Sequence, residues 1–345
     1  GITNKQENSK QVNEEILIFM GDSYGDGWND GYISIYEYKV FDKSVGFNIV
    51  NHKNNLAGIL QSHGTSQIDV SIFNFQNHRL GYFGFQIIPP ISTTYDMGNN
   101  EIYLVRHLDA DANLNDNINK NALQIITINI VHNKAYGNII EVDDFSSNIN
   151  GFFAFSGIKG PGRTSLDPVR EPIMNFPEFR KVGDEIFAVM TWVSNITPVP
   201  NPYFVRTNIR WAILKYNKNK KIWELFQQGK VDDEILSYWM PTISLHDDGH
   251  VSLLFSGTSN DLPPSLYFTR KSFADKSFKK PKKIISGNGS VNASRWGDYF
   301  SLGNVSPYEI VGIGAVSSNN PSNTETWTSK LTFPGIYFDL KCSSD

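Results

Sequence analysis

The sequence predicts an all-β protein with two domains built from short antiparallel strands. Its length of 345 residues leaves room for two domains of ordinary size. It is 40% hydrophobic and 13% aromatic, mostly Phe and Tyr, which is enough to bury substantial cores. Long runs of helix-forming residues are absent, and turn residues separate short apolar segments. These three observations together favour strands and turns over helices.

The N-terminal third predicts an arm, a small domain and a linker. Residues 1–14 are polar and aperiodic, so we expect a mobile arm there. Residues 15–90 hold short apolar or alternating segments, and Pro89-Pro90 ends the last one because proline cannot donate to a sheet ladder. Their spacing predicts a β-sandwich over residues 15–90. Residues 91–100 are polar and predict a linker. The predicted strand segments are 16–20, 33–36, 70–75 and 82–88.

Residues 101–335 predict a repeated architecture. Strand pairs alternate with turn-rich segments along this stretch. The strand segments are 101–105, 124–131, 186–193, 209–216, 251–255, 265–269 and 310–316. Blades of β-propellers run about 40–50 residues each, so this stretch holds about five. The prediction is a β-propeller of about five blades over residues 101–335, followed by a short tail at 336–345.

Five motifs keep a fixed order in the second half of the chain. They are Arg210-Trp211, Trp223 followed by Gln227-Gln228-Gly229, Trp239-Met240-Pro241-Thr242-Ile243, Asp247-Asp248-Gly249-His250 and Arg295-Trp296-Gly297-Asp298-Tyr299. In order and spacing they resemble the C-terminal blades of a family of secreted microbial β-propeller proteins. His250 stands where that family usually has Asn. The resemblance implies a propeller in a secreted or surface-exposed protein.

A further motif, with a resemblance of its own, lies in the N-terminal domain. Residues 22–29 read Asp-Ser-Tyr-Gly-Asp-Gly-Trp-Asn. This string resembles the DSYGDGWN motif of extracellular β-sandwich modules found in secreted and cell-surface proteins of microbes. The resemblance implies an extracellular location. The chain starts at Gly1 without a signal-peptide pattern, so we expect that any signal segment has been removed.

The aromatic and charged residues of these motifs have two interpretations. A tryptophan ring buries much apolar area, so we expect the tryptophans to fill the space between neighbouring blades. Arg295 and Asp298 are expected to pair across a turn and fix it. The alternative is that Arg295, Trp296, Asp298 and Tyr299 contact a ligand at the mouth of the propeller.

Two acidic segments are candidate calcium sites. Asp22, Asp26 and Asp30 lie at four-residue spacing in a Gly-rich loop. Calcium prefers hard oxygen ligands, and Gly permits a tight wrap of the loop. The alternative is a turn whose Asp side chains accept hydrogen bonds from local backbone N–H groups.

The second acidic segment contains Asp109, Asp111 and Asn113, which fit the start of an EF-hand loop. That loop needs Gly at its sixth position and Glu at its twelfth, where this chain has Leu114 and Lys120. The segment is therefore not an EF-hand. A calcium site of another kind and a solvated insertion in a blade both remain open.

Composition argues against several classes of function. The formal net charge is −4, and the Lys279–Lys283 stretch has no aromatic residues between its lysines, so nucleic-acid binding has little electrostatic support. No apolar run approaches the roughly 18 residues of a membrane-spanning helix. The histidines lack metal-binding spacing. Cys342 is the single cysteine, which excludes an internal disulfide and leaves a free thiol, an intermolecular bridge or a tail without a role.

The sequence therefore predicts a non-catalytic secreted or surface module that binds a glycan or a surface protein. No nucleophile-elbow, P-loop or dinucleotide-binding string occurs. One alternative is a propeller glycosidase or other carbohydrate-active enzyme, which needs two carboxylates across a pocket; Asp167, Glu171, Asp184 and Asp298 are the candidates. The other is a structural subunit of an extracellular, virion or filament assembly that associates through residues 1–14 or the C-terminal tail.

Overall fold

The structure of the protein is a computed structural model. It describes residues 18–21, 32–35, 38–39, 44–52, 55–62, 67–74, 79–86, 101–108, 110, 119–129, 132, 134–146, 158–161, 165–166, 177–196, 206–289, 300–306, 309–317, 324–332 and 337–342. For residues 18–86 and 324–342 only the course of the backbone is described.

The described residues form β-strands joined by turns. The strands are β1 (Ile18–Gly21), β2 (Tyr32–Ile35), β3 (Tyr38–Lys39), β4 (Ser44–His52), β5 (Asn55–Ser62), β6 (Gln67–Asn74), β7 (Arg79–Gln86), β8 (Glu101–Leu108), β9 (Ala122–Asn129), β10 (Lys134–Glu141), β11 (Ile158–Lys159), β12 (Ser165–Leu166), β13 (Glu178–Val182), β14 (Glu185–Asn195), β15 (Thr207–Asn217), β16 (Ile222–Val231), β17 (Ser237–Leu245), β18 (His250–Thr258), β19 (Ser265–Ser272), β20 (Lys282–Ile285), β21 (Ser301–Ser306), β22 (Glu309–Ser317), β23 (Thr324–Thr332) and β24 (Tyr337–Cys342). This confirms the predicted all-β class. In this part of the chain no helix is long and apolar enough to span a membrane.

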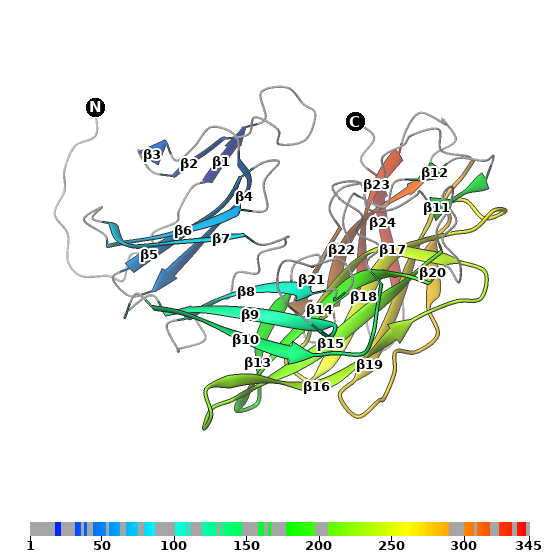
Figure 1. The fold of residues 1–345 in the computed structure, drawn as a ribbon. Coiled ribbons are helices and arrows are strands. Elements are labelled where there is room, and N and C mark those ends of the chain that lie inside the picture. Colours follow the sequence, from blue (N-terminus) through cyan, green and yellow to red (C-terminus); the bar gives the residue numbers. More distant parts are fainter. Residues whose placement is uncertain are drawn as a thin grey trace, which may run out of the picture.

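The strands pair in chain order, each with the next, in antiparallel sheets (Figure 1). The sheets are β1-β2-β3, β4-β5-β6-β7, β8-β9-β10, β11-β12, β13-β14-β15-β16, β17-β18-β19-β20 and β21-β22-β23-β24. The first two sheets occupy the region predicted to be a β-sandwich, and β6 and β7 overlap the strands expected at 70–75 and 82–88. The last three sheets are four-stranded meanders, which is the build of a propeller blade.

The central strands of the β13–β16 and β17–β20 sheets carry apolar residues on both faces because each of these two sheets packs between two others. In β14 every residue from Ile186 to Ser194 is buried. Ala188, Met190 and Trp192 belong to one hydrophobic core, whereas Phe187 and Val189 belong to the next. Alternation along one strand thus divides its side chains between two interfaces.

The buried side chains among the described residues form three hydrophobic cores. In the first, Tyr103 and Leu123 of the β8–β10 sheet pack with Trp192 and Trp223 of the β13–β16 sheet. The rings of Tyr103 and Trp223 meet edge to face with centroids 5.2 Å apart. This geometry adds to the energy of apolar burial.

The second core joins the opposite face of the β13–β16 sheet, including Trp211, to Tyr238 and Phe255 of the β17–β20 sheet. The third joins Trp239 of that sheet to Phe300 and neighbouring residues of β21 and β22. The four tryptophans in these cores are at most 2% exposed. The prediction that tryptophans fill the space between adjacent sheets is therefore confirmed for Trp192, Trp211, Trp223 and Trp239.

The prediction of a tail at residues 336–345 is wrong for most of that segment. Tyr337–Cys342 form β24, which pairs with β23, and Cys342 lies opposite Trp327 in the register. Phe338, Leu340 and Cys342 alternate with the polar residues Asp339 and Lys341, which is the period-2 pattern of a strand. The expected arm at residues 1–14 and the linker at residues 91–100 lie outside the described residues.

Candidate functional site

The candidate site lies at one end of the β13–β16 and β17–β20 sheets, which we call the loop end. The register places the end of β14 beside the start of β15, because Asn195 lies opposite Thr207. It also places Val231, the last residue of β16, opposite Ile209. The loop end therefore carries the connections 196–206 and 232–236. The 259–264 connection lies at the same end, because Thr258, the last residue of β18, lies opposite Ser237, the first residue of β17.

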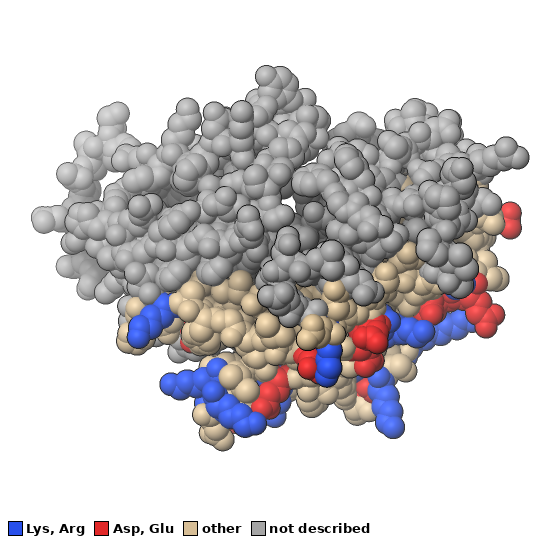
Figure 2. All heavy atoms as spheres, in the orientation of Figure 1, with Lys and Arg blue, Asp and Glu red and all other residues tan. Residues whose placement is uncertain are grey.

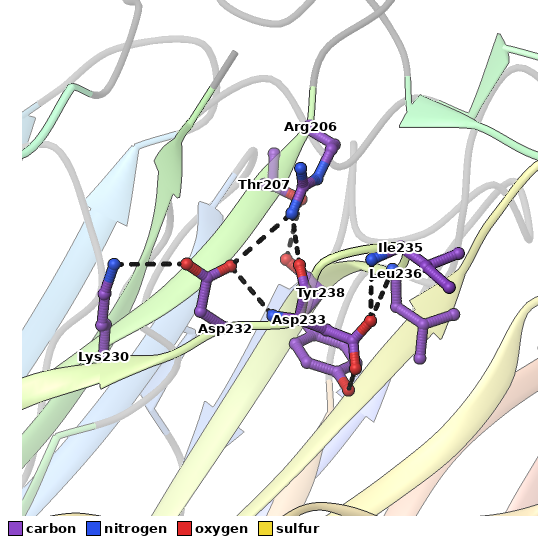
Figure 3. A network of polar contacts seen from close by, with 8 residues as sticks. All are labelled: Arg206, Thr207, Lys230, Asp232, Asp233, Ile235, Leu236 and Tyr238. Carbon is purple, nitrogen blue, oxygen red and sulfur yellow. Dashed lines mark hydrogen bonds and ion pairs between the residues drawn. The ribbon is translucent and has the colours of Figure 1, made fainter. Parts of the chain in front are cut away.

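The 232–236 connection is held by a network of polar contacts (Figure 3). The Asp232 carboxylate forms ion pairs with the Lys230 ammonium, at 3.3 Å, and with the Arg206 guanidinium, at 4.0 Å. The guanidinium of Arg206 also donates to the backbone carbonyl of Asp233. Thr207 at the start of β15 donates to the carbonyl of Tyr238 at 2.8 Å. The network thus ties the start of β15 to the connection that leads into the next sheet.

Asp233 organises the tip of this connection. Its carboxylate accepts the backbone N–H groups of Ile235 and Leu236 at 2.9 and 3.0 Å. Burial opposes ionisation of Asp233, but the hydrogen bonds from Leu236 and Ile235 outweigh it and lower its pKa. Burial and the nearby Asp233 raise the pKa of the Tyr238 hydroxyl, so this phenol stays neutral. An ionised Asp233 is therefore part of the fold of the connection.

Polar side chains continue from this network along the face of β15 that points to the β8–β10 sheet. Asn208 and Arg210 share this face with Ala212, a member of the first core. Arg210 donates to the carbonyl of Asp144 at 2.5 Å. Burial lowers the pKa of Arg210, and Asp143, Asp232 and Asp144 oppose the shift. The guanidinium therefore links two sheets and stays close to three carboxylates.

Asn208 is fully buried, and neither polar atom of its amide makes a hydrogen bond within the described part of the chain. An unpaired buried amide costs about 1–3 kcal/mol. Its cross-strand neighbour Ser194 instead contacts the backbone of Ser146 at 3.3 Å. Asn208 therefore offers the two N–H donors of its amide nitrogen and its carbonyl oxygen to any polar group that reaches this face.

The rim of the site consists of charged side chains that are held by ion pairs and are partly exposed. The side chains of Arg206, Lys230 and Asp232 are 40%, 55% and 31% exposed, respectively. Gln228 exchanges two hydrogen bonds with Asp143, each 2.9 Å long. Figure 2 shows that basic and acidic side chains are interspersed on the described part of the face in view. Such a rim presents hydrogen-bond donors and acceptors side by side.

The predicted ligand-binding residues Arg295, Trp296, Asp298 and Tyr299 lie outside the described residues. What is described is the chain just before them. Gly287 donates its backbone N–H to Ser265 at 3.0 Å, and Asn288 donates to the carbonyl of Ser317 at 2.8 Å. Since β19 begins at Ser265, the chain leaves for this motif from the loop end.

The predicted calcium ligands also lie outside the described residues. They are Asp22, Asp26, Asp30, Asp109, Asp111 and Asn113. The residues that the structure does describe contain no cluster of three or more metal-binding side chains.

Of the four carboxylates predicted as candidates for an enzyme, Asp184 is the one that lies among the described residues. Asp184 lies in the β13–β14 turn with a fully exposed side chain, 4.0 Å from Lys181. That turn is at the opposite end from Asp232. Asp167, Glu171 and Asp298 lie outside the described residues.

The Gln227-Gln228-Gly229 motif connects three sheets. The Gln227 amide donates to the carbonyl of Phe273 at 2.7 Å, while Gln228 reaches Asp143 on the other side. Gly229 faces the Trp211 ring, which leaves no room for a Cβ atom. A β-bulge at Phe226, which has no partner in the register, sets which way these side chains point. The motif is explained by packing between sheets.

A second polar cluster lies at the opposite end of the sheets. Glu178 of β13 accepts hydrogen bonds from the Ser244 hydroxyl at 2.7 Å and the Leu245 N–H at 2.9 Å. Arg180 pairs with Glu178 at 2.7 Å and with Asp247 at 2.6 Å. These contacts join the first strands of two neighbouring sheets.

His246 and His250 flank the turn within this second cluster. His246 is 1% exposed, and its Nε2 lies 3.2 Å from the Ser252 hydroxyl. Burial, reinforced by Arg270, lowers the pKa of His246 to about 4. His250 Nδ1 lies 2.9 Å from Asp248. The two rings thus have separate partners.

Sequence reasoning missed Arg206, Asn208, Lys230, Asp232 and Asp233 as site residues. Arg210 was noticed only as part of a motif. The register that sets Ile209 and Arg210 of β15 opposite Val231 and Lys230 of β16 brings residues of both strands to one corner, and the sequence carries no direct signal of this pairing.

No family model and no curated protein matches this chain. Among solved structures it is similar to an ulvan lyase from a new family of polysaccharide lyases, with 8% identity and a TM-score of 0.50, over 90% of this chain and 77% of that one. It is also similar to the β-propeller domain of the trilobed protease from Pyrococcus furiosus, with 8% identity, a TM-score of 0.42 and coverage of 85% and 70%. A thermostable family-43 glycoside hydrolase aligns with 9% identity, a TM-score of 0.32 and coverage of 86% and 91%. The chain is thus an all-β protein whose structural neighbours include a β-propeller domain.

Proposed function

We propose that this protein is a non-catalytic secreted or surface module that binds a glycan at the loop end. The observation that carries the proposal is the rim formed by Arg206, Lys230 and Asp232. These side chains are held by ion pairs and yet remain 31–55% exposed. Sugar hydroxyl groups both donate and accept hydrogen bonds, so they suit a surface where cations and a carboxylate alternate. Groups that are already positioned lose less conformational entropy on binding.

The proposal includes the parts of the chain that carry the two resemblances. We propose that the Arg295–Tyr299 segment contributes to the same ligand surface, and the path of the chain away from the loop end at Gly287 and Asn288 supports this. The finer architecture that we propose is an N-terminal sandwich and a propeller of about five blades. The Asp22–Asp30 loop supports an extracellular setting with calcium, since extracellular modules share its sequence.

The test is a glycan array followed by calorimetry on the whole chain. Lys230→Ala should weaken binding of the best glycan about tenfold, the effect of losing roughly one charged hydrogen bond. Lys181→Ala is the matched control, because it removes an exposed lysine at the opposite end of the same sheets. Equal loss in both variants, or no glycan bound at all, would contradict the proposal. Melting with and without calcium tests the metal site separately.

A carbohydrate-active enzyme is the second candidate. The fold similarity to a polysaccharide lyase, with a TM-score of 0.50, is the observation in its favour. A lyase leaves unsaturated sugar ends that absorb in the ultraviolet, whereas a hydrolase only releases reducing ends. Incubating the protein with a panel of neutral and acidic polysaccharides and following both signals distinguishes the two enzymes from a binder. Steady product formation would replace the binding proposal with this one.

A further inference from the structure

A cluster of exposed lysines lies where the β19–β20 connection enters β20, in residues 276–283, which we call the lysine segment. Five of its eight residues are lysines with exposed side chains, and none is acidic. The lysines are Lys276, Lys279, Lys280, Lys282 and Lys283. Because the formal net charge of the whole chain is −4, the segment is a local concentration of positive charge on an acidic protein.

These lysines lack the acidic partners that lysines elsewhere in the chain have. Within the described residues, none of the five forms an ion pair with a carboxylate. Ion pairs with carboxylates are formed by Lys120, Lys181, Lys215, Lys220 and Lys230. Positive charges without partners repel one another, so an anion that bridges several of them relieves this repulsion.

The backbone of the lysine segment is held in place. The Phe278 ring meets the Trp211 ring edge to face, with centroids 5.2 Å apart, and packs against the second core. Lys279 donates its backbone N–H to the carbonyl of Arg270 at 3.2 Å, and its own carbonyl accepts the Thr269 hydroxyl at 2.5 Å. The lysine side chains thus extend from a fixed backbone, so a ligand has only these side chains to order.

The lysine segment leads into the loop end. The strand β20 ends at Ile285, and this residue lies opposite Leu266, one residue after the start of β19. The pKa of Asp233, which burial raises and backbone hydrogen bonds lower, is lowered further by the charge of Lys280. Lys280 therefore lies near the 232–236 connection, and the lysine segment continues the surface to which we assign glycan binding.

Protection of a sheet edge accounts for only part of this cluster. Lysines on an outer strand hinder edge-to-edge pairing with other chains. Lys282 and Lys283 have this position, because β20 is the outer strand of its sheet (Figure 1). Lys276 and Lys280 lie outside the strand, where protection of its edge requires no charge. A ligand with several negative charges accounts for all the lysines of the segment.

We infer that the lysine segment binds the negatively charged groups of an acidic polysaccharide, whose hydroxyl groups contact the loop end. This inference rests on the glycan-binding function proposed above and names the class of glycan. A lysine ammonium group attracts anions as a point charge, so carboxylates and sulfates on the sugars are both suitable. Nucleic acid is less suitable because its bases stack on free aromatic rings, and Phe278, the aromatic residue of the segment, packs against Trp211.

Calorimetry of the whole chain with polymers of known charge tests this inference. The probes are polygalacturonate, which carries carboxylates, dextran sulfate, which carries sulfates, and neutral dextran. At least one acidic polymer should bind about tenfold or more tightly than dextran, and the tighter of the two identifies the charged group. Its affinity should fall steeply as salt rises from about 50 to 200 mM, because a bound polyanion releases its counterions.

A triple variant tests whether the lysine segment carries the binding. Lys280→Gln, Lys282→Gln and Lys283→Gln together should weaken binding of the acidic polymer at least about tenfold. The salt dependence should flatten as well, since three fewer charges of the polymer are neutralised. Thermal melting of every variant checks that it is folded.

The matched control removes the same charge at the other end of the sheets. It combines Lys218→Gln, Lys220→Gln and Lys221→Gln, which replace exposed lysines in the turn between β15 and β16. This variant should bind the acidic polymer within about twofold of the wild type. An equal loss of affinity in both triple variants overturns the inference, because net charge alone would then explain the binding.

Three further results overturn the inference, and they separate it from the proposed function. Single-stranded DNA that binds as tightly as the acidic polymer rules out a preference for polysaccharide. If dextran binds as well as the acidic polymers and the lysine-segment variant is unaffected, while Lys230→Ala still weakens binding, glycan binding stands and only this inference fails. If the wild type binds no polysaccharide, the proposed function fails together with it.

Discussion

The ammonium group of Lys271 lies 4.8 Å from the centroid of the Trp211 ring, and both side chains are 1% exposed. The same ammonium donates to the side-chain oxygen of Gln227. Lys271 lies on β19 and Trp211 on β15, so the contact crosses the second core. A desolvated cation over an indole face contributes about 2 kcal/mol. This buried charge makes the second core sensitive to pH.

Stability should rise with pH through the titration of Lys271. Burial lowers the pKa of Lys271 to about 8, and Asp275 opposes the shift. Between about pH 8 and its ordinary value of 10.5 the unfolded chain holds a proton that the folded chain has lost, so raising the pH favours the folded state. The gain across this window is about 3 kcal/mol. Urea unfolding of wild type and Lys271→Met at pH 7, 8, 9 and 10 measures it.

Lys271→Met is the informative comparison because it keeps the length of the side chain and removes the titrating group. The tyrosines with raised pKa values, such as Tyr103, affect both proteins alike. Above pH 8 the free energy of unfolding of the wild type should therefore increase relative to that of the variant. Parallel curves would show that the Lys271 charge is solvated in the native state.

Acid should destabilise the protein through His246. Its pKa is lowered to about 4, chiefly by burial, so between pH 6.5 and 4 the unfolded chain binds a proton that the folded chain does not. Stability is fully present above pH 6.5 and falls by about 3 kcal/mol as the pH approaches 4. In His246→Gln the loss of stability over this window should be smaller. Unfolding free energies at half-unit steps from pH 7.5 to 4 provide the measurement, and equal slopes would rule out His246 as the cause.

Gly229 should not tolerate even a methyl group. An added Cβ would lie 2.7 Å from Cζ2 of Trp211, which is itself enclosed in the second core. Gly229→Ala should destabilise the protein by about 1–3 kcal/mol, as overpacked cores do. Gly303→Ala is the control, because a Cβ there has no atom within 4 Å. Thermal melts of both variants suffice; a Gly229→Ala protein as stable as the Gly303→Ala protein would mean that Trp211 moves freely.

Glu178 should matter far more to stability than an exposed glutamate nearby. Glu178→Ala removes the acceptor of the Ser244 hydroxyl and the Leu245 N–H, both of which are buried. Leaving buried donors unpaired should cost about 2–4 kcal/mol. Glu185→Ala breaks only an exposed ion pair with Lys215 and should cost at most about 1 kcal/mol. Denaturant midpoints compare the two, and similar losses would show that the Glu178 contacts are replaced by water.

The sequence predicted the class of the fold because its strongest signals are local. An apolar run such as Ile186–Val193 predicts a buried strand from its own residues. A large apolar ring such as that of Trp211 is stabilised by burial, so it predicts a core position. The strand β10 was missed because its residues are mostly exposed and its core contact rests on Ile140. Apolar alternation marks strands that have a buried face, so it does not predict a strand that is almost wholly exposed.

The candidate site was less predictable because it depends on register. Asn208 and Lys230 are far apart in sequence and meet at one corner only because β15 and β16 pair as they do. The bulge at Phe226 shifts that pairing by one residue, and no residue pattern around Phe226 predicts a bulge. The role of Gln227 and Gln228 also needed the neighbouring sheets, since their partners Phe273 and Asp143 come from both sides.

The layered order of the sheets has a consequence for how the molecule loses its structure. The first two cores join the β8–β10, β13–β16 and β17–β20 sheets in chain order, as in repeat proteins. The third joins the β17–β20 sheet to β21 and β22 and also includes Ile158 and Leu166 of β11 and β12. Cooperativity then passes from sheet to sheet through the interfaces. The β13–β16 and β17–β20 sheets, covered on both faces, should exchange their amide hydrogens last. The described side chains of the β8–β10 sheet and of the β21–β24 sheet each belong to one core, so these sheets should open earlier, and partly unfolded states should retain the Lys271–Trp211 contact.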